Sequence, residues 1–447
     1  MATPVDPLGT VSATGELAPP PAASGPAPAE PNATRISDMI AAIARIGADQ
    51  SGGVTRLGFS EAEREAHRLV GTWLADLGLR VRQDAVGNTI AELGDEASSS
   101  PAIGIGSHLD SVPGAGRFDG VAGVVAAVEV ARMLSDDGLG RPLRIVCFAG
   151  EEGARFGEPC LGSQAVAGRL GRADLTRIRD ASGTSLADAM TGVGLSTERV
   201  DGARWRPNEW AAFLELHIEQ GRTLERLGVP IGVVDVVSGS SRIRMTIRGR
   251  ADHSGGTPMD ERLDALVAAA EVVTEMERIA RLPANRGARS TVGRLDVLPN
   301  SLTTIPGRVD LVVDIRDVDS ERLRRITEHA LAIGSDVCHR RGLLLESTVI
   351  AHTAPVVLPI WLRQAAMEVC AGLDIRHRVM ASGAGHDAQF VNAIVPAALL
   401  FVPSRDGLSH VPEEWTSVTD IATGARVLLE LARRIDSQLH SMESAQA

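Results

Sequence analysis

The sequence predicts an α/β fold in two parts: a domain with a central, mostly parallel sheet flanked by helices, and a smaller α+β domain inserted into it. Short apolar runs separated by helical stretches predict the first part, because strands buried on both faces are apolar throughout. Segments that alternate apolar and polar residues predict the second part, since such strands keep one face in water.

The chain of 447 residues is about three times as long as a typical domain, so we expect more than one folding unit. Residues 1–34 are rich in Pro, Ala, Gly and Ser and are expected to form a disordered arm. We assign 35–235 and 351–447 to the larger domain and 236–350 to the inserted domain.

The elements of the larger domain follow in order along the chain. Ser60 and Glu63 predict a capping box, and apolar residues at helical spacing continue to Gly78. The stretch 121–134 is apolar at most positions and is expected to be a helix. Buried strands are predicted at four short apolar runs, which are 102–107, 143–149, 211–216 and 397–403.

In the inserted domain, 242–248 and 309–315 alternate apolar and polar residues and are predicted to be half-exposed strands. Apolar residues recur at helical spacing over 263–273, and 320–334 is a second helical stretch. A last strand is predicted at 343–350. The order strand, helix, strands, helix, strand is typical of a ferredoxin-like α+β sandwich.

The composition argues against several classes of function. The chain has 45 basic and 57 acidic residues and a net charge of -12, which argues against a nucleic-acid-binding protein. No apolar stretch reaches the roughly 18 residues needed to cross a bilayer, so we expect no membrane association. Every basic residue is arginine, and without lysine neither Schiff-base chemistry nor a P-loop is available.

The cysteines and the N-terminus favour a cytoplasmic location. The four cysteines show no Cys-x-x-Cys spacing, so neither a zinc cage nor a disulfide framework is predicted. The first residues lack the basic segment and apolar core of a signal peptide. We therefore expect the protein to be in the reducing cytoplasm.

Histidine and acidic residues occur at five places near the ends of the apolar runs. In an open α/β sheet the carboxyl ends of parallel strands form the crevice that binds ligands, so we expect these residues to converge. A single His or Glu near a strand end is more often structural, but coincidence accounts poorly for five such places. The residues are His108, Asp110, Asp119, Glu151, Glu152, His217 and His410.

This set of side chains suits a pair of metal ions. Three histidines with two or three carboxylates can hold two divalent cations about 3.5–4 Å apart, provided that one carboxylate bridges them. Asp119, the acidic residue of a tight glycine-rich loop, is the best candidate for the bridge. Asp110 can fix the tautomer of His108. Of the adjacent Glu151 and Glu152, one is expected to bind metal while the other takes a proton from bridging water.

Motifs in one order along the chain carry a resemblance to a known family. They are GSHLDSVPGAGRFDGVAGV (106–124), EEGARF (151–156), LELHIEQG (214–221), ADHSGGTPMDER (251–262), PNSLTTIPG (299–307), VDIR (313–316), SGAGHDA (382–388) and PSRDGLSHVPEEWTS (403–417). With them the sequence resembles the M20 metallopeptidase-like superfamily. HIEQG and DHSGGTPM point to its branch of N-carbamoyl-L-amino acid hydrolases, allantoate amidohydrolases and β-ureidopropionases.

The resemblance implies two divalent metal ions, for which zinc, manganese, cobalt and nickel remain open. Glu151 would act as the general base and then protonate the leaving nitrogen, with Asp110 supporting the site. The implied ligands are His108, Asp119 and His217 for one ion, and Asp119, Glu152 and His410 for the other.

The resemblance also implies that 236–350 is the lid and dimerisation domain of a homodimer. His253 would reach into the partner subunit's active site and stabilise the developing oxyanion; the alternative is a solvated loop histidine. Arg316 would bind the substrate carboxylate; the alternative is an ion pair with Asp314 or Asp317. Further substrate contacts are implied for Gln220, Gly385 and His386, and for Thr303, which stands where relatives commonly carry Asn.

The expected activity is hydrolysis of the ureido C–N bond of N-carbamoyl-L-amino acids or related ureido acids to amine, carbon dioxide and ammonia. Metal assistance suits this substrate, because two nitrogens donate into the ureido carbon and make it a poor electrophile. Allantoate, β-ureidopropionate and a dipeptide remain open as alternative substrates. Two other classes are a catalytically silent binding protein on the same fold and a structural dimer whose acidic cluster only buffers ions.

Overall fold

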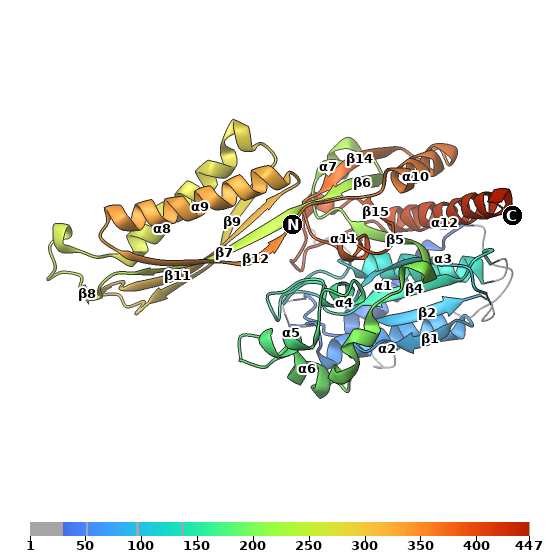
Figure 1. Cartoon of the computed structure of the whole chain (residues 1–447), viewed down its shortest axis with the longest axis horizontal. Helices are drawn as coiled ribbons and strands as arrows, with labels where there is room; N and C mark the ends of the chain where they lie inside the picture. The colour runs from blue at the N-terminus through green and yellow to red at the C-terminus, as the bar shows by residue number, and fades with distance from the viewer. Residues whose placement is uncertain (1–29, 51, 95–97, 136–137, 447) are drawn as a thin grey trace, which may run out of the picture. The chain divides into compact units, whose positions relative to one another are not determined.

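The computed structural model describes residues 30–50, 52–94, 98–135 and 138–446. These residues form two compact units, which Figure 1 colours along the chain. The described part of the first unit contains the chain up to Asp235, 358–380 and the segment from His386 on. The second unit contains Val236–Val357 and Ala381–Gly385.

Most strands of a nine-stranded sheet lie in the first unit and form its centre. In order across the sheet its strands are β1 (Arg80–Gln83), β2 (Thr89–Leu93), β4 (Leu143–Phe148), β3 (Ala102–His108), β5 (Trp210–Ile218), β15 (Ala397–Val402), β6 (Ile231–Val237) and β13 (Val356–Val357), with β14 (His377–Ser382) beside β6. The central strands β4, β3, β5 and β15 are mutually parallel, whereas their neighbours β2 and β6 run antiparallel to them. The predicted, mostly parallel central sheet is confirmed.

Helices cover this sheet. The buried α3 (Val121–Leu134) lies on β3 and β5, and α1 (Ala33–Arg45) and α12 (Val418–Gln446) pack against α3. The other helices of the unit are α2 (Glu61–Asp76), α4 (Leu161–Val166), α5 (Arg172–Arg177), α6 (Leu186–Gly192), α7 (Thr223–Leu227), α10 (Ile360–Gly372) and α11 (Asp387–Val391), with 3-10 turns at η1 (Thr197–Ala203), η2 (Pro207–Glu209) and η5 (Arg405–Gly407). None of the described helices combines the length and apolar character that crossing a membrane requires.

The N-terminal arm was predicted to extend over 1–34, but residues 1–29 lie outside the described part of the chain. Helix α1 begins at Ala33, within the last residues assigned to the arm, and the Asn32 side chain caps it by accepting a hydrogen bond from the backbone of Arg35 at 2.9 Å. An asparagine at this position offers the side-chain oxygen that a free helix N–H needs, which explains where the helix starts.

The capping box of α2 is present only in part. The Ser60 hydroxyl accepts the backbone N–H of Glu63 at 3.2 Å, as predicted. The Glu63 carboxylate accepts instead the backbone N–H groups of Phe59 and Gly150, each at 2.7 Å. Because Glu63 is fully buried, its carboxylate ties the start of α2 to the loop after β4 instead of closing on Ser60.

The second unit is a four-stranded antiparallel sheet with two long helices on one face (Figure 1). The strands, in order across the sheet, are β12 (Leu344–Thr353), β7 (Gly239–Arg248), β11 (Arg308–Asp317) and β9 (Arg289–Leu298). Its helices are α8 (Ala265–Arg281) and α9 (Ser320–Arg340), and the smaller elements are β8 (Asp252–His253), β10 (Thr304–Ile305), η3 (Met259–Glu261) and η4 (Pro283–Asn285). The chain order matches the expected strand, helix, strands, helix, strand. The assigned domain end at 350 falls inside β12.

Gly123 tests how closely α3 must approach the sheet. A Cβ atom at this position would lie 2.1 Å from the carbonyl oxygen of Leu216 in β5. We expect Gly123→Ala to lower the free energy of unfolding by about 1–3 kcal/mol, because neither backbone can yield without repacking. Urea denaturation measures the change. Gly192→Ala is the control, because the added Cβ atom would meet no other atom within 4 Å, and it should be neutral or slightly stabilising.

Candidate metal centre

His108 and Asp119 meet at the end of strand β3. His108 is the last residue of the strand, and the loop that follows returns to place Asp119 just before α3. Gly120, with a φ of 65°, lies under the His108 ring, where a Cβ atom would come within 2.5 Å of the imidazole. Glycine is therefore required here both for the left-handed backbone and for the space that the ring occupies.

The first group of metal-ligand atoms comes from β3, its loop and β5. His217 Nε2 lies 3.0 Å from Asp119 Oδ1 and 3.4 Å from His108 Nε2, and His108 Nε2 lies 3.6 Å from the same Asp119 oxygen. All three side chains are buried. Two imidazole nitrogens and one carboxylate oxygen that face a common point are a donor set typical of zinc and similar divalent cations.

The second group uses the other oxygen of Asp119. His410 Nε2 lies 3.3 Å from Asp119 Oδ2 and 3.2 Å from Glu152 Oε2. His410 stands in the loop after β15 with a φ of 62°, and its side chain is about half exposed, at 47%. Asp119 thus offers one oxygen to each group, as a carboxylate that bridges two cations must.

The charges of the centre favour a bound cation. Hydrogen bonds to Asp119 and Glu152 raise the pKa of His410 to about 11. Although burial opposes it, the Asp119 carboxylate raises the pKa of His217 to about 9. The negative potential that holds protons on these imidazoles would equally attract a divalent cation, which competes with protons for the same nitrogens. The donor set therefore fits a metal.

Backbone carbonyls orient two of the histidines. His217 Nδ1 lies 2.9 Å from the carbonyl oxygen of Ile218, and His108 Nδ1 lies 3.2 Å from that of Asp110. A carbonyl only accepts hydrogen bonds, so each Nδ1 carries the proton and each Nε2 keeps its lone pair for the centre. The Asp110 carboxylate, 3.4 Å from His108 Nδ1, adds to this effect.

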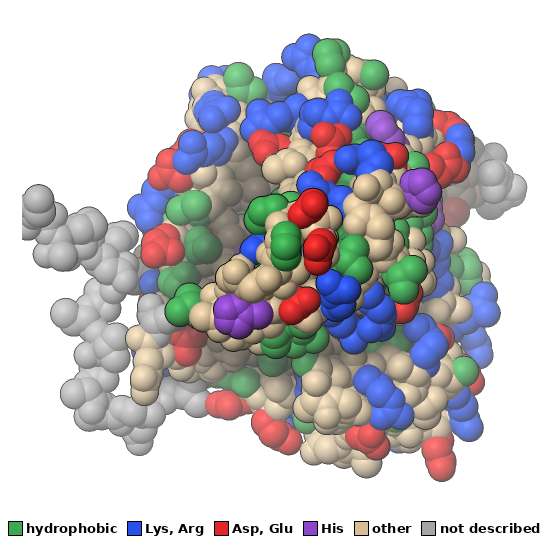
Figure 2. Space-filling model, turned by 90° about the vertical axis from the view of Figure 1, so that its left-hand side faces the viewer, with side chains coloured by type: hydrophobic (Ala, Val, Ile, Leu, Met, Phe, Trp, Pro, Cys, Tyr) green, Lys and Arg blue, Asp and Glu red, His purple; other side chains and the backbone are tan. Residues whose placement is uncertain are grey.

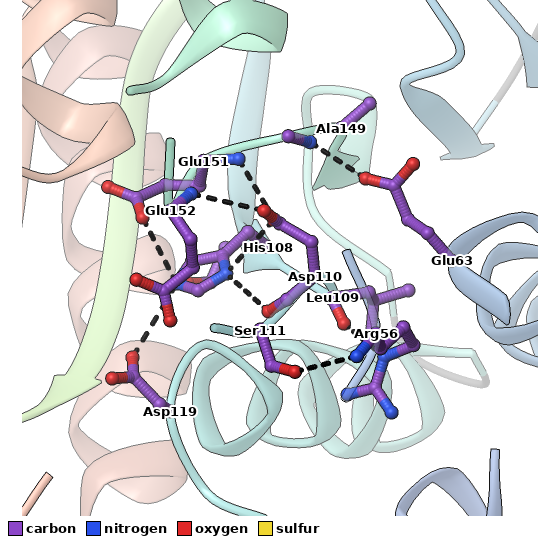
Figure 3. A network of polar contacts seen from close by, with 12 residues as sticks. Arg56, Glu63, His108, Leu109, Asp110, Ser111, Asp119, Ala149, Glu151 and Glu152 are labelled. Carbon is purple, nitrogen blue, oxygen red and sulfur yellow. Dashed lines mark hydrogen bonds and ion pairs between the residues drawn. The ribbon is translucent and has the colours of Figure 1, made fainter. Parts of the chain in front are cut away.

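Asp110 also holds the glutamate pair. Its Oδ1 accepts the backbone N–H of Glu151 at 2.9 Å and its Oδ2 accepts that of Glu152 at 3.1 Å, as Figure 3 shows. Both glutamates reach the centre, because the chain turns at Gly150, which has a φ of 62°. The sequence predicted that Asp110 orients His108, but its contact with the glutamate backbone was not predicted.

Glu151 has the position and the acidity expected of a base. Its Oε2 lies 3.7 Å from His108 Nε2, while its Oε1 accepts the Cys160 thiol at 3.1 Å. Burial raises its pKa to about 7; His108 opposes the shift, and Glu152 and Asp110 add to it. A carboxylate whose pKa is near neutral can both take and return a proton.

Glu414 and Ser409 support Asp119 and were missed in the sequence. Glu414 Oε1 accepts the backbone N–H groups of Phe118 and Asp119, at 2.9 and 3.1 Å. Ser409 Oγ lies 2.8 Å from Asp119 Oδ2 and 2.9 Å from Glu414 Oε2. The only sign of this support in the sequence was Glu414 itself, the second of two acidic residues that follow His410. Asp119 is thus held by a segment almost 300 residues away in the chain.

Two of the residues implied for substrate binding lie at the centre. Gln220 donates through Nε2 to Asp119 Oδ2 at 2.7 Å. The buried ring of His386 packs edge-on against His217, with 4.5 Å between ring centroids. Gly385, the residue before His386, belongs to the second unit.

The remaining implied residues all lie in the second unit. His253 lies in, and Thr303 next to, the small two-stranded sheet of β8 and β10; both residues are exposed, and the carbonyl of Thr303 accepts the backbone N–H of Ser254 at 2.9 Å. Arg316 donates through Nε to Asp314 at 2.8 Å, which is the ion pair considered as the alternative to substrate binding. Asp317, the other candidate partner, pairs with Arg322.

Comparisons with known proteins identify relatives that match most of the chain. Residues 104–434 match peptidase family M20/M25/M40. The chain is 38% identical over 396 residues to an N-carbamoyl-L-amino acid amidohydrolase of Geobacillus stearothermophilus, covering 88% of this chain and 96% of the relative. It is 36% identical to an allantoate amidohydrolase of Bacillus subtilis, with 90% and 97% covered. A crystal structure of AtUAH in complex with (S)-hydroxyglycine superposes with a TM-score of 0.85 at 31% identity, with 91% and 98% covered.

Glu414 provides a test of how the bridging carboxylate is held. We expect Glu414→Ala to weaken metal binding about 10–100-fold, because Phe118 and Asp119 lose their acceptor. Glu414→Gln keeps an acceptor oxygen of the same reach and should stay close to the wild type. Competition with a chromophoric chelator measures the affinity. The control is Glu413→Ala at the exposed neighbouring position; equal losses in the Ala and Gln variants of Glu414 would contradict this role.

Proposed function

The chain belongs to peptidase family M20/M25/M40, and from this premise we propose that it is a metal-dependent amidohydrolase of ureido acids. It hydrolyses the ureido C–N bond of N-carbamoyl-L-amino acids or related compounds to amine, carbon dioxide and ammonia. One observation carries the proposal. Asp119 offers its two oxygens to two separate groups of ligand atoms, with the buried Glu151 beside them.

In this proposal each chain binds two divalent cations. Zinc, manganese, cobalt and nickel would all suit the donor atoms. Bound cations would lower the pKa of water and polarise the ureido oxygen. The proposed ligands are His108, Asp119 and His217 for one cation, and Asp119, Glu152 and His410 for the other.

Glu151 moves the proton of the reaction. Its Oε2, which faces His108, takes a proton from water as the water oxygen bonds to the ureido carbon, and later gives that proton to the nitrogen that leaves. The thiol of Cys160 and the backbone contact from Asp110 keep the carboxylate in place during both steps. Water thus supplies the oxygen of the product and the hydrogen of the amine.

His253 is proposed as a hydrogen-bond donor to the substrate across a homodimer. Its Nδ1 accepts the backbone N–H groups of Gly255 and Gly256 at 3.1 and 3.0 Å, so the proton of the neutral ring is on Nε2. This N–H is free to donate to an oxyanion that develops in the partner subunit's site. The lid and dimerisation role of 236–350 belongs to the same proposal.

The substrate carboxylate is assigned to Arg316, whose Nη atoms remain available because only Nε is bound to Asp314. Gln220, Thr303, Gly385 and His386 would complete the pocket. The four cysteines are free thiols, which agrees with action in the cytoplasm. The net charge of -12 agrees with a small-molecule substrate and not a nucleic acid.

Allantoate is the second candidate substrate. The allantoate amidohydrolase of Bacillus subtilis is almost as similar to this chain as the N-carbamoyl-L-amino acid amidohydrolase of Geobacillus stearothermophilus, at 36% against 38% identity. Thr303 stands where the family resemblance implies Asn, and a hydroxyl donates one hydrogen bond where an amide donates two. This exchange affects which ureido acid fits more than which bond is broken.

The role of Glu151 can be tested directly. Glu151→Gln should lower kcat by about 10²–10⁴-fold, because the amide cannot accept the proton, while metal content stays at the wild-type level. Ammonia release and metal analysis of the same preparation give both values. Glu209→Gln, on the exposed surface, is the matched control. Undiminished turnover in Glu151→Gln would remove the proposed base.

A substrate panel separates the proposed activity from its alternatives. We expect the metal-reconstituted protein to release ammonia fastest from N-carbamoyl-L-amino acids, because the chain is 38% and 37% identical to two amidohydrolases named for that activity. Allantoate, 3-ureidopropionate and a dipeptide are the competing substrates, ranked by kcat/KM. Cleavage of the dipeptide alone would contradict the proposal and indicate a peptidase.

A further inference from the structure

The outer face of the β12-β7-β11-β9 sheet ends in a row of four residues whose side chains can donate hydrogen bonds. Cross-strand pairing aligns Thr353 with Ser240, Ser240 with Arg316, and Arg316 with Arg289. The opposite face of the same strands is apolar and packs against α8 and α9. This row, which we call the terminal row, therefore faces away from the core of the unit, with two guanidinium groups and two hydroxyls.

The terminal row is poor in negative charge. Elsewhere on this unit arginines have acidic partners, as Arg248 has Glu346 and Arg308 has Asp310. On the face that Figure 2 shows, which is the left-hand side of Figure 1, basic and acidic side chains are interspersed. Next to the terminal row Arg242 and Arg316 share the carboxylate of Asp314. Within the described part of the chain, the Arg289 side chain forms no hydrogen bond or ion pair.

Two like charges on directly opposed residues repel each other, so this arrangement costs free energy unless an anion occupies it. Arg316 already uses Nε for Asp314, which leaves its two Nη atoms for one carboxylate. The whole guanidinium group of Arg289 remains available for a second carboxylate.

A glycine makes room for Arg289. A Cβ atom at Gly383 would lie only 2.9 Å from Arg289 Nη1 and 3.0 Å from its central carbon, so the guanidinium rests against the bare backbone of this loop. The loop is fixed to the start of β7, because the carbonyl of Ser382 accepts the backbone N–H of Ser238 at 3.0 Å. Two residues further on, the loop reaches Gly385, which was assigned to the substrate pocket.

We propose that Arg289 is a second anion-binding residue beside Arg316 and that it selects ureido acids with two carboxylates, such as N-carbamoyl derivatives of acidic amino acids. The inference rests on the proposed function, since it takes Arg316 as the residue that binds the first carboxylate. The second carboxylate, on the side chain of the substrate, pairs with Arg289, and the hydroxyls of Ser240 and Thr353 add donors to the same row.

Isosteric substrate pairs test the proposal. N-carbamoyl-L-glutamate and N-carbamoyl-L-glutamine differ only in the side-chain carboxylate. The wild type should prefer the glutamate derivative at least tenfold in kcat/KM, or about 1.4 kcal/mol, mainly through KM. Arg289→Gln should reduce this ratio to about twofold, since the pairing charge is gone. Arg294→Gln, on the same strand and paired with Asp296, should keep the wild-type ratio.

The outcomes separate this inference from the function on which it rests. A wild type that prefers N-carbamoyl-L-glutamine, or an Arg289→Gln protein with an unchanged ratio, overturns the role of Arg289. If the protein turns over neither compound, the proposed function is overturned. Calorimetry with the Glu151→Gln protein then still tests the role of Arg289, by comparing the affinities for the two compounds. Adding Arg289→Gln to this variant must abolish the preference for the dicarboxylate.

Discussion

Four carboxyl groups, those of Asp110, Asp119, Glu151 and Glu152, lie close together in the interior of the first unit, and their repulsion is the constraint that the surrounding structure must meet. Isolated buried carboxylates take up protons instead of staying charged. Here imidazoles and backbone N–H groups surround the carboxyl groups. The negative charge that these neighbours leave unbalanced would bind divalent cations. Burial raises the pKa of Glu151 to about 7, and the charges of Glu152 and Asp110 add to the shift.

The loops that carry these groups are held by other carboxylates. Asp110 accepts the N–H groups at the start of the Glu151 loop, Glu63 accepts that of Gly150, and Glu414 accepts those of Phe118 and Asp119. Hydrogen bonds to charged acceptors are stronger and shorter than neutral ones. Loops rich in glycine, which would otherwise be free to move, therefore present their side chains at fixed positions.

The second unit meets a different requirement. Its core of Ile243, Met245, Leu311 and similar residues lies on one side of the sheet, so the other side is open to charged residues. Because the chain contains no lysine, the basic side chains there are arginines, whose planar guanidinium groups can each form two hydrogen bonds to a carboxylate. This choice of residue makes the surface suited to recognising acids by geometry as well as by charge.

The sequence by itself determined the four central strands and the convergence of His108, Asp119, Glu152, His217 and His410, because apolar runs mark buried parallel strands and such strands end at one edge. The contact of Asp110 with the backbone of the glutamate pair, the support from Glu414 and Ser409, the diversion of Glu63 from its expected cap and the position of Arg289 against Gly383 became visible only in the tertiary structure. Each depends on a hydrogen bond or close approach between segments far apart in the chain. Local periodicity records which side of an element is buried, but it holds no information about the path of a distant loop.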